Sequence, residues 1–182
     1  MKRCTWPVID VELEYHDNEW CKESHDNRYL FEMLVLEMMQ AGLSWRTILL
    51  RREAYRKAFH NFDIDKISKM DESDVERLMQ DASIIRHKLK ITSIIHNAKL
   101  IKENNIDMDS FMWKYVDFKQ IINDVKETDA AVASNKLSIQ ISNDLKKIGF
   151  KFVGPTIMYS YMQAIGMIDD HINTCDFKNN RP

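Results

Sequence analysis

Apolar residues recur at helical spacing over several long stretches of the chain. The most regular stretch begins after Ser24 and Asp26, either of which can cap a helix N-terminus, and runs to about Gln40. One stripe of this predicted helix carries Leu30, Met33, Leu34, Glu37 and Ala41. Glu37 is therefore a carboxylate on an otherwise apolar face, and Gly42 is expected to end the helix.

The same reading predicts further helices along the rest of the chain. Ser44 caps a helix from about Trp45 to His60, Asp63 and Ser73 cap two short ones, and Arg86 to Lys102 forms a longer one with Ile91, Ile94, Ile95 and Ala98 facing inward. Residues 104–134 are polar and weakly periodic, so short helices or loops are expected there. Lys136 to Ile148 is helical and ends at Gly149; a tight connection over 150–154 follows, and Pro155 opens a helix to about Ile165. The stretch before residue 24 is predicted to be irregular.

Composition agrees with an all-α protein. Only 4 Gly and 3 Pro occur in 182 residues, which is too few for the turns of many short strands. With 45% hydrophobic and 30% charged residues, the chain is an ordinary globular one that is long enough to bury a core. No repeat, low-complexity tract or flexible linker interrupts it, and residues 1–182 are expected to form a single unit.

The charge balance limits the possible partners. The net charge is −2 and the pI about 6.3, so binding to DNA would require a local basic patch. Neither a secretory signal nor a run of eighteen apolar residues is present, so we expect a cytoplasmic protein without a membrane partner. In that compartment Cys4, Cys21 and Cys175 stay reduced, which favours metal binding over a disulfide.

Two pairs of potential metal ligands lie at opposite ends of the chain. Cys4 and His16 are separated by eleven residues, and His171 and Cys175 by three. Two thiolates and two imidazoles form a standard tetrahedral set for structural zinc, and a shared ion would tie both termini to the body. Four unrelated residues are the alternative, which spacing alone leaves open. Because four protein ligands leave no open position, such a metal would be structural.

Aromatic residues accumulate near the first ligand pair and after the Glu37 helix. They are Trp6, Tyr15, Trp20 and Trp45. No Lys or Arg falls on the apolar stripe of Glu37, and aromatic faces with one carboxylate suit a flat cationic ligand. The alternative is that the aromatics are core residues and that Glu37 caps a neighbouring backbone or reaches a distant Arg.

The segment from Lys146 to Thr156 has the pattern of a helix, a glycine-bounded hairpin and a second helix. Gly149 and Gly154 permit close backbone approach, free amides at a helix N-terminus suit a phosphate, and Lys147 and Lys151 supply local positive charge. An ordinary corner between two helices would have the same pattern.

Four stretches together resemble the 3-methyladenine DNA glycosylase I family, of the helix-hairpin-helix superfamily of repair glycosylases. They are Tyr15-His16-Asp17-Asn18-Glu19-Trp20; Leu36-Glu37 with Gln40-Ala41-Gly42-Leu43-Ser44-Trp45; Ile84-Ile85-Arg86-His87; and Gly149 to Gly154 with Tyr159-Ser160-Tyr161-Met162-Gln163-Ala164 and Asp170-His171. The resemblance implies a helix-hairpin-helix glycosylase-like helical bundle whose N- and C-termini are tied by a structural zinc. It further implies a monofunctional hydrolase that removes N3-methylated adenine from double-stranded DNA, leaves an abasic site, needs no organic cofactor and has no obligate protein partner.

The resemblance also assigns roles to individual residues. Glu37 and Tyr15 match the residues that hydrogen-bond the excised base, and Trp45 matches the one that stacks on it. Trp6, Trp20 and Ser160 match other parts of the pocket; Gly149, Lys151 and Gly154 match the DNA-binding hairpin; Cys4, His16, His171 and Cys175 match the zinc ligands. Asp170 is expected to support the neighbouring ligand His171.

The chain departs from the family pattern at several points. Val11 to Glu14 replace a stretch that usually contains a Pro and an aromatic, which predicts an altered pocket wall, and Cys21-Lys22-Glu23 replaces a glycine-containing turn. The stretch 117–135 is divergent. Two other functions remain as alternatives: a zinc-stabilised module that binds alkylated DNA without chemistry, and a catalytic metalloenzyme.

Overall fold

A helix buried on all its sides forms the centre of the computed structural model, which describes residues 1–178. This helix is α2 (Asn27–Gln40), and ten consecutive residues, 30–39, are buried. The predicted cap at Asp26 is confirmed, because its carboxylate accepts the Tyr29 N–H at 2.7 Å. The last four residues of the expected unit, 179–182, lie outside the described part of the chain.

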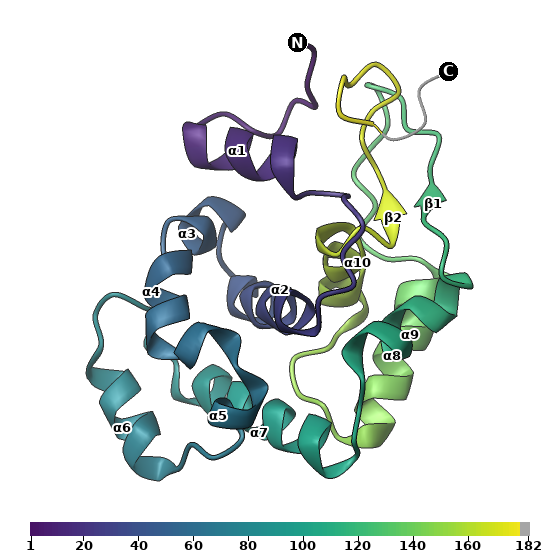
Figure 1. Cartoon of the computed structure of the whole chain (residues 1–182). Helices are drawn as coiled ribbons and strands as arrows, with labels where there is room; N and C mark the ends of the chain where they lie inside the picture. The colour runs from purple at the N-terminus through teal and green to yellow at the C-terminus, as the bar shows by residue number, and fades with distance from the viewer. Residues whose placement is uncertain (179–182) are drawn as a thin grey trace.

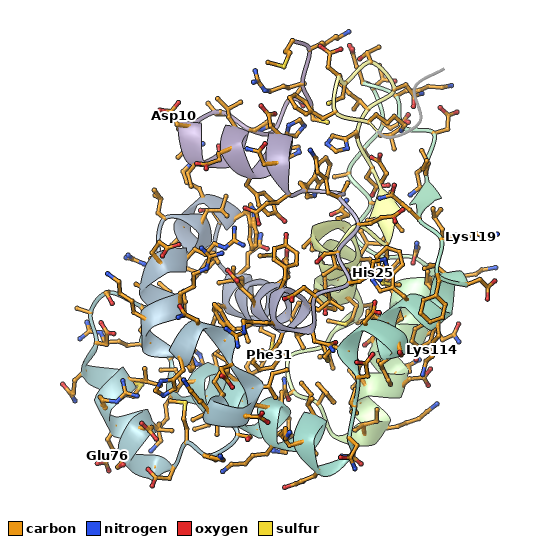
Figure 2. The ribbon with its side chains drawn as sticks, in the orientation of Figure 1. Asp10, His25, Phe31, Glu76, Lys114 and Lys119 are labelled. Carbon is orange, nitrogen blue, oxygen red and sulfur yellow. The ribbon has the colours of Figure 1, made fainter. Side chains whose placement is uncertain are left out.

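Around α2 the chain forms a nearly all-helical assembly (Figure 1). The first half contributes α1 (Asp10–Asn18), α3 (Trp45–Leu49), α4 (Arg52–Ala58), the short 3-10 helix η1 (His60–Phe62), α5 (Ile64–Ile67) and α6 (Glu72–Gln80). The second half contributes α7 (Lys88–Glu103), α8 (Met108–Trp113), the 3-10 helix η2 (Lys114–Val116), α9 (Lys136–Ile148) and α10 (Pro155–Ala164). In Figure 2, Phe31 of α2 lies among the side chains that fill the interior, whereas Asp10 and Glu76 lie at the periphery.

Several predicted boundaries are confirmed. Ser44 caps α3 by accepting the Thr47 N–H, and Asp63 caps α5 by accepting the Lys66 N–H. Gly149 ends α9 with a left-handed φ of 108°, a conformation that glycine adopts without strain. Pro155 is the first residue of α10, where its missing N–H leaves no hydrogen bond unmade.

Three features differ from the sequence-based expectation. The helix predicted from Trp45 to His60 is two helices, α3 and α4, separated at residues 50–51, and α6 is capped by Asp71, not by Ser73. The N-terminal stretch expected to be irregular contains α1. Glu12 fixes the start of α1 by accepting the N–H groups of Val8 and Ile9.

A two-residue parallel ladder departs from the purely helical expectation. Strand β1 (Ile121–Ile122) pairs with β2 (Ile168–Asp169), with Ile121 opposite Ile168. The ladder brings the divergent stretch after η2 next to the C-terminal segment. That segment lies beside the N-terminus, since Asp176 N–H donates to the Lys2 carbonyl at 2.8 Å (Figure 1). No helix among residues 1–178 has the length and apolar character that crossing a membrane requires.

Candidate functional site

An aromatic cleft of about 190 Å³ opens where four helices and the N-terminal segment meet. Its lining includes all six residues that the sequence placed in a base pocket, together with one that it missed: Trp6, Tyr15, Trp20, Glu37, Gln40, Trp45 and Ser160. Gln40 follows Glu37 by three positions on α2, which places both on the same helical face. This spacing from Glu37 is the feature of the sequence from which Gln40 could have been predicted as a lining residue.

The rings of the cleft contact one another at steep angles. Tyr15 and Trp45 have centroids 5.2 Å apart and tilted by 58°, and Trp6 and Trp20 are 5.2 Å apart in an edge-to-face arrangement. Trp6 also meets Tyr15 edge-on at 6.3 Å. Because these rings meet edge to face and do not form one stack, a flat ligand has ring faces available to it.

Glu37 is the unusual group of the cleft. Its side chain is 5% exposed, and the described residues offer its carboxyl neither a hydrogen bond nor an ion pair. Burial alone raises its pKa from the ordinary 4.5 to about 8. The alternatives of a backbone cap or a distant Arg therefore do not hold among residues 1–178. A carboxyl buried without a partner therefore keeps its proton at neutral pH, and its ionised form becomes favourable when a ligand supplies a positive charge or a donor.

Further polar atoms of the cleft lack partners. The indole N–H groups of Trp6 and Trp45 are buried without an acceptor among the described residues. Burial, with a smaller contribution from Glu37 and other acidic or phenolic groups, raises the pKa of Tyr15 well above its ordinary value, so its hydroxyl is a donor. The cleft thus combines aromatic faces, hydroxyl and N–H donors, and one carboxyl.

The altered stretch at residues 11–14 lies in α1 but does not line the cleft. Its main polar role is the ion pair of Glu12 with Arg46 at 3.0 Å, which joins α1 to α3 next to Trp45. Residues 11–14 are not among those that line this cavity, and the effect of the missing Pro and aromatic on the pocket wall stays a prediction.

A cluster of potential metal ligands adjoins the cleft. The ligand atoms of Cys4, His16 and Cys175 lie within 4.8 Å of one another, and Cys175 Sγ is 3.6 Å from His16 Nε2. All three residues are buried. This trio could hold a metal ion, and it brings together residues from the two ends of the chain.

His171, the fourth predicted ligand, lies beside this trio and not within it. Its ring centroid is 4.9 Å from that of His16, and its ligand atom is grouped with Cys21 and Asp169. His171 Nε2 is nevertheless buried without a hydrogen-bond partner among residues 1–178. A buried imidazole nitrogen of this kind is available to a metal.

Each histidine of the cluster is oriented by a carboxylate. His16 Nδ1 lies 2.8 Å from Asp17 Oδ1, and His171 Nδ1 lies 2.7 Å from Asp169 Oδ1. Such a bond fixes the ring and leaves Nε2 for a metal. The expected partner of His171 was Asp170, and this prediction is wrong. Asp170 instead accepts hydrogen bonds from Tyr159, Gln163 and Asn123.

The cluster and the cleft share a wall. Trp20 stacks on His16 with centroids 5.8 Å apart and meets His171 edge-on at 4.7 Å. Trp6 meets His16 edge-on at 5.5 Å. A metal held by these imidazoles would therefore also fix the two indoles that form one side of the cleft.

The glycine-bounded hairpin joins α9 to α10. Its Gly154 has an ordinary φ of −62°, and a Cβ added there would meet no atom within 4 Å. Neither backbone conformation nor internal packing requires a glycine at this position. The exposed Lys151 lies in the same connection, and α10 begins directly after it, so the chain offers a cation and helix N-terminal amides to the same region.

The sequence that forms this helical fold and cleft matches one protein family over almost its whole length. Residues 7–179 match the model of the methyladenine glycosylase family, and the chain belongs to this family. It is similar to DNA-3-methyladenine glycosylase 1 of Escherichia coli K12, with 45% identity over 100% of each chain. Among solved structures it is similar to a 3-methyladenine DNA glycosylase I, with a TM-score of 0.92, 46% identity and coverage of 96% of this chain and 98% of the other. A structure of the Staphylococcus aureus 3-methyladenine DNA glycosylase I, described as the basis of its 3-methyladenine recognition, also has a TM-score of 0.92, with 34% identity over 100% of this chain and 99% of that chain.

Proposed function

We propose that this chain is a monofunctional DNA-3-methyladenine glycosylase, a hydrolase that cleaves the N-glycosidic bond of N3-methylated adenine in DNA during base excision repair. The observation that carries the proposal is the buried, unpartnered carboxyl of Glu37 in a cleft lined by aromatic rings. The names of the similar proteins support the same activity.

The chemistry of the cleft suits this substrate. Methylation at N3 makes adenine a flat cation, and such a ligand is attracted by aromatic faces and by a carboxylate. In the proposal, Trp45 stacks on the flipped base, Glu37 and Tyr15 hydrogen-bond it, and Trp6, Trp20 and Ser160 complete the pocket. Gln40 is a further candidate contact.

The reaction follows from the charge on the base. Flipping the nucleotide out of the stack costs a few kcal/mol, which is recovered from contacts in the cleft. As the bond between the sugar carbon and the base nitrogen breaks, its electron pair neutralises the cationic base. Water then adds to the sugar carbon and releases one proton to the solvent. The base therefore leaves without first being protonated. Among residues 1–178 no lysine lines the cleft, so a Schiff-base intermediate and strand cleavage are not part of the proposal.

The hairpin is the proposed contact with the DNA backbone, in the manner of a helix-hairpin-helix element. Gly154 leaves open space at the N-terminus of α10, Gly149 shapes the turn, and Lys151 supplies positive charge. A local cation of this kind suits a protein whose net charge is −2. Double-stranded DNA with an alkylated base is the partner.

A structural zinc held by Cys4, His16, His171 and Cys175 is the proposed cofactor, tying the two ends of the chain together. The unpartnered His171 Nε2 and the carboxylate that orients each histidine support it. Burial raises the pKa of Cys4 to about 12, so its thiolate needs a nearby cation, which zinc provides. Four protein ligands leave no position for a substrate, which argues against a catalytic metal.

Residues 1–182 are proposed to act as a single catalytic unit in the cytoplasm. The pair Cys4 and Cys175 is buried without forming a disulfide, which fits a reducing compartment.

The test is base release from DNA methylated at random by a simple alkylating agent, with chromatography of the released bases. Release of 3-methyladenine with 7-methylguanine left in place is the expected result. A folded, zinc-loaded protein that binds the same DNA but releases no base would instead be a binding module, and the proposal would be wrong.

A further inference from the structure

Helix α7 carries buried polar residues on the face that it turns towards α2 and the hairpin. Lys90 is 5% exposed and Asn97 is fully buried. They are seven residues apart, which is two helical turns and about 10 Å along the axis, so both point from the same face. Neither residue lines the aromatic cleft. Buried polar side chains persist only when they are paired, and their partners here lie in two different parts of the proposed site.

Asn97 is bonded to the hairpin in both directions. Its Nδ2 donates to the Lys151 carbonyl at 3.0 Å, and its Oδ1 accepts the Lys151 N–H at 2.9 Å. The same Nδ2 lies 3.4 Å from the sulfur of Met38, the neighbour of Glu37 on α2. A planar amide with two opposed hydrogen bonds fixes both the distance and the direction of its partner, which an apolar contact does not do.

Lys90 is bonded to the end of the helix that carries Glu37. Its Nζ donates to the Met39 carbonyl at 2.9 Å and to the Ala41 carbonyl at 2.7 Å. These are carbonyls at the C-terminus of α2, which lack partners within the helix and carry its partial negative charge. The loop that begins there leads directly to Trp45.

We propose that Lys90 and Asn97 are positioning residues that hold the hairpin at a fixed place relative to the aromatic cleft. Through them, one rigid helix connects the backbone that meets DNA with the end of α2 that presents the carboxyl to the flipped base. The inference rests on the proposed function and adds a role for α7. A duplex must reach hairpin and cleft at once, so a displaced hairpin weakens DNA binding while the cleft still accepts a free base.

The surroundings of Lys151 separate this role from a purely structural one. Lys151 belongs to the exposed connection between α9 and α10, and replacing Asn97 removes the bonds to both its N–H and its carbonyl. His96 still holds the Gly149 carbonyl at 2.9 Å. Loss of the amide therefore frees the centre of the hairpin while the helices on either side remain packed.

The experiment compares Asn97→Leu with a control from the same helix. Ser93 lies between the two positions, is buried, and donates its hydroxyl hydrogen to Leu89 of its own helix at 2.7 Å, so Ser93→Ala serves as the control. Three quantities are measured on the full-length, zinc-loaded protein: the affinity for free 3-methyladenine by tryptophan fluorescence, the affinity for a duplex with a stable abasic-site analogue, and amide hydrogen exchange.

For Asn97→Leu we expect at least a tenfold loss of duplex affinity, with free-base affinity within twofold of the unchanged protein. Hydrogen exchange should increase over residues 149–154 and not along α7. Ser93→Ala should change none of the three. Lys90→Met, which releases the end of α2, should weaken free-base binding as well as duplex binding.

Duplex affinity within twofold for Asn97→Leu would overturn the inference. So would a parallel loss of both affinities with faster exchange throughout α7, which would indicate a structural role only. If Asn97→Leu does not fold, Asn97→Ser is measured in its place. If the unchanged protein binds no 3-methyladenine, the proposed function fails, and the duplex and exchange measurements on the variants still decide the inference.

Discussion

Replacing Glu37 with Gln should make the protein more stable and less active at the same time. The folded-state pKa of about 8 lies above the ordinary 4.5, so the folded protein binds a proton that the unfolded chain releases between these values. The contribution of Glu37 to the free energy of unfolding is therefore most favourable below pH 4.5 and declines as the pH rises towards 8. At pH 7, which is 2.5 pH units above 4.5, ionisation of Glu37 in the unfolded chain lowers the free energy of unfolding by 1.36 kcal/mol per unit, or about 3 kcal/mol in all.

Gln cannot ionise and avoids this cost. Glu37→Gln should therefore raise the free energy of unfolding by about 3 kcal/mol at pH 7, equivalent to roughly 6–12 °C in Tm, and by less than about 1 kcal/mol at pH 5. Base release should fall roughly 10- to 100-fold, because a hydrogen bond to a charged group contributes about 1.5–3 kcal/mol.

The assay is urea unfolding of both proteins at pH 5, 7 and 8, with single-turnover base release measured in parallel. Glu32→Gln is the matched comparison on α2, because Glu32 is buried but pairs with Arg52 at 2.6 Å and Arg56 at 2.8 Å. That variant should lose stability. Equal stability of Glu37→Gln and the unchanged protein at all three pH values would refute the reasoning, as would an unaffected rate of release.

Three further variants test the proposed stacking residue of the cleft, the carboxylate that orients His171, and the ion pair that joins α1 to α3. Trp45→Ala should weaken binding of free 3-methyladenine roughly 5- to 100-fold, whereas Trp45→Phe should retain most of it, because stacking of one base contributes about 1–3 kcal/mol; fluorescence titration of both variants checks this. Asp169→Asn should lower zinc affinity about 10- to 100-fold in a competition with a chelator, since the bond that orients His171 weakens, while Asp170→Asn should leave zinc affinity unchanged. Arg46→Ala should lower the stability slightly at neutral pH, because the hydrogen bonds from Arg46 contribute most to lowering the pKa of Glu12 to about 2, while solvent screens the half-exposed Arg46. In unfolding experiments this difference should shrink as the pH falls below 4.5 towards 2.

The local sequence was sufficient for the elements whose signals lie within a few residues. Asp26, Ser44, Asp63, Gly149 and Pro155 mark helix ends as predicted, because capping and fixed backbone angles act over one turn. All residues of the cleft except Gln40 were identified through their resemblance to a family. From the residues alone, the stripe that carries Glu37 indicated a carboxyl on an apolar face.

Tertiary contacts decided the features that depend on distant partners. Helix α1 has no continuous apolar stripe from which the sequence would predict it. It is joined to α3 by the ion pair of Glu12 with Arg46, which are 34 residues apart. The ladder of β1 and β2 pairs Ile121 with Ile168, which no local pattern can indicate.

The neighbours Asp169 and Asp170 show the same division most clearly. Both are carboxylates beside His171, a proposed metal ligand, and the sequence offers no reason to prefer one. Successive side chains of extended backbone point to opposite sides, so only one of the two can meet the His171 ring. The packing of β2 turns Asp169 inward to His171 and directs Asp170 to Tyr159 and Gln163. The sequence by itself determined which residue types surround the site, and the three-dimensional arrangement determined which of them act on it.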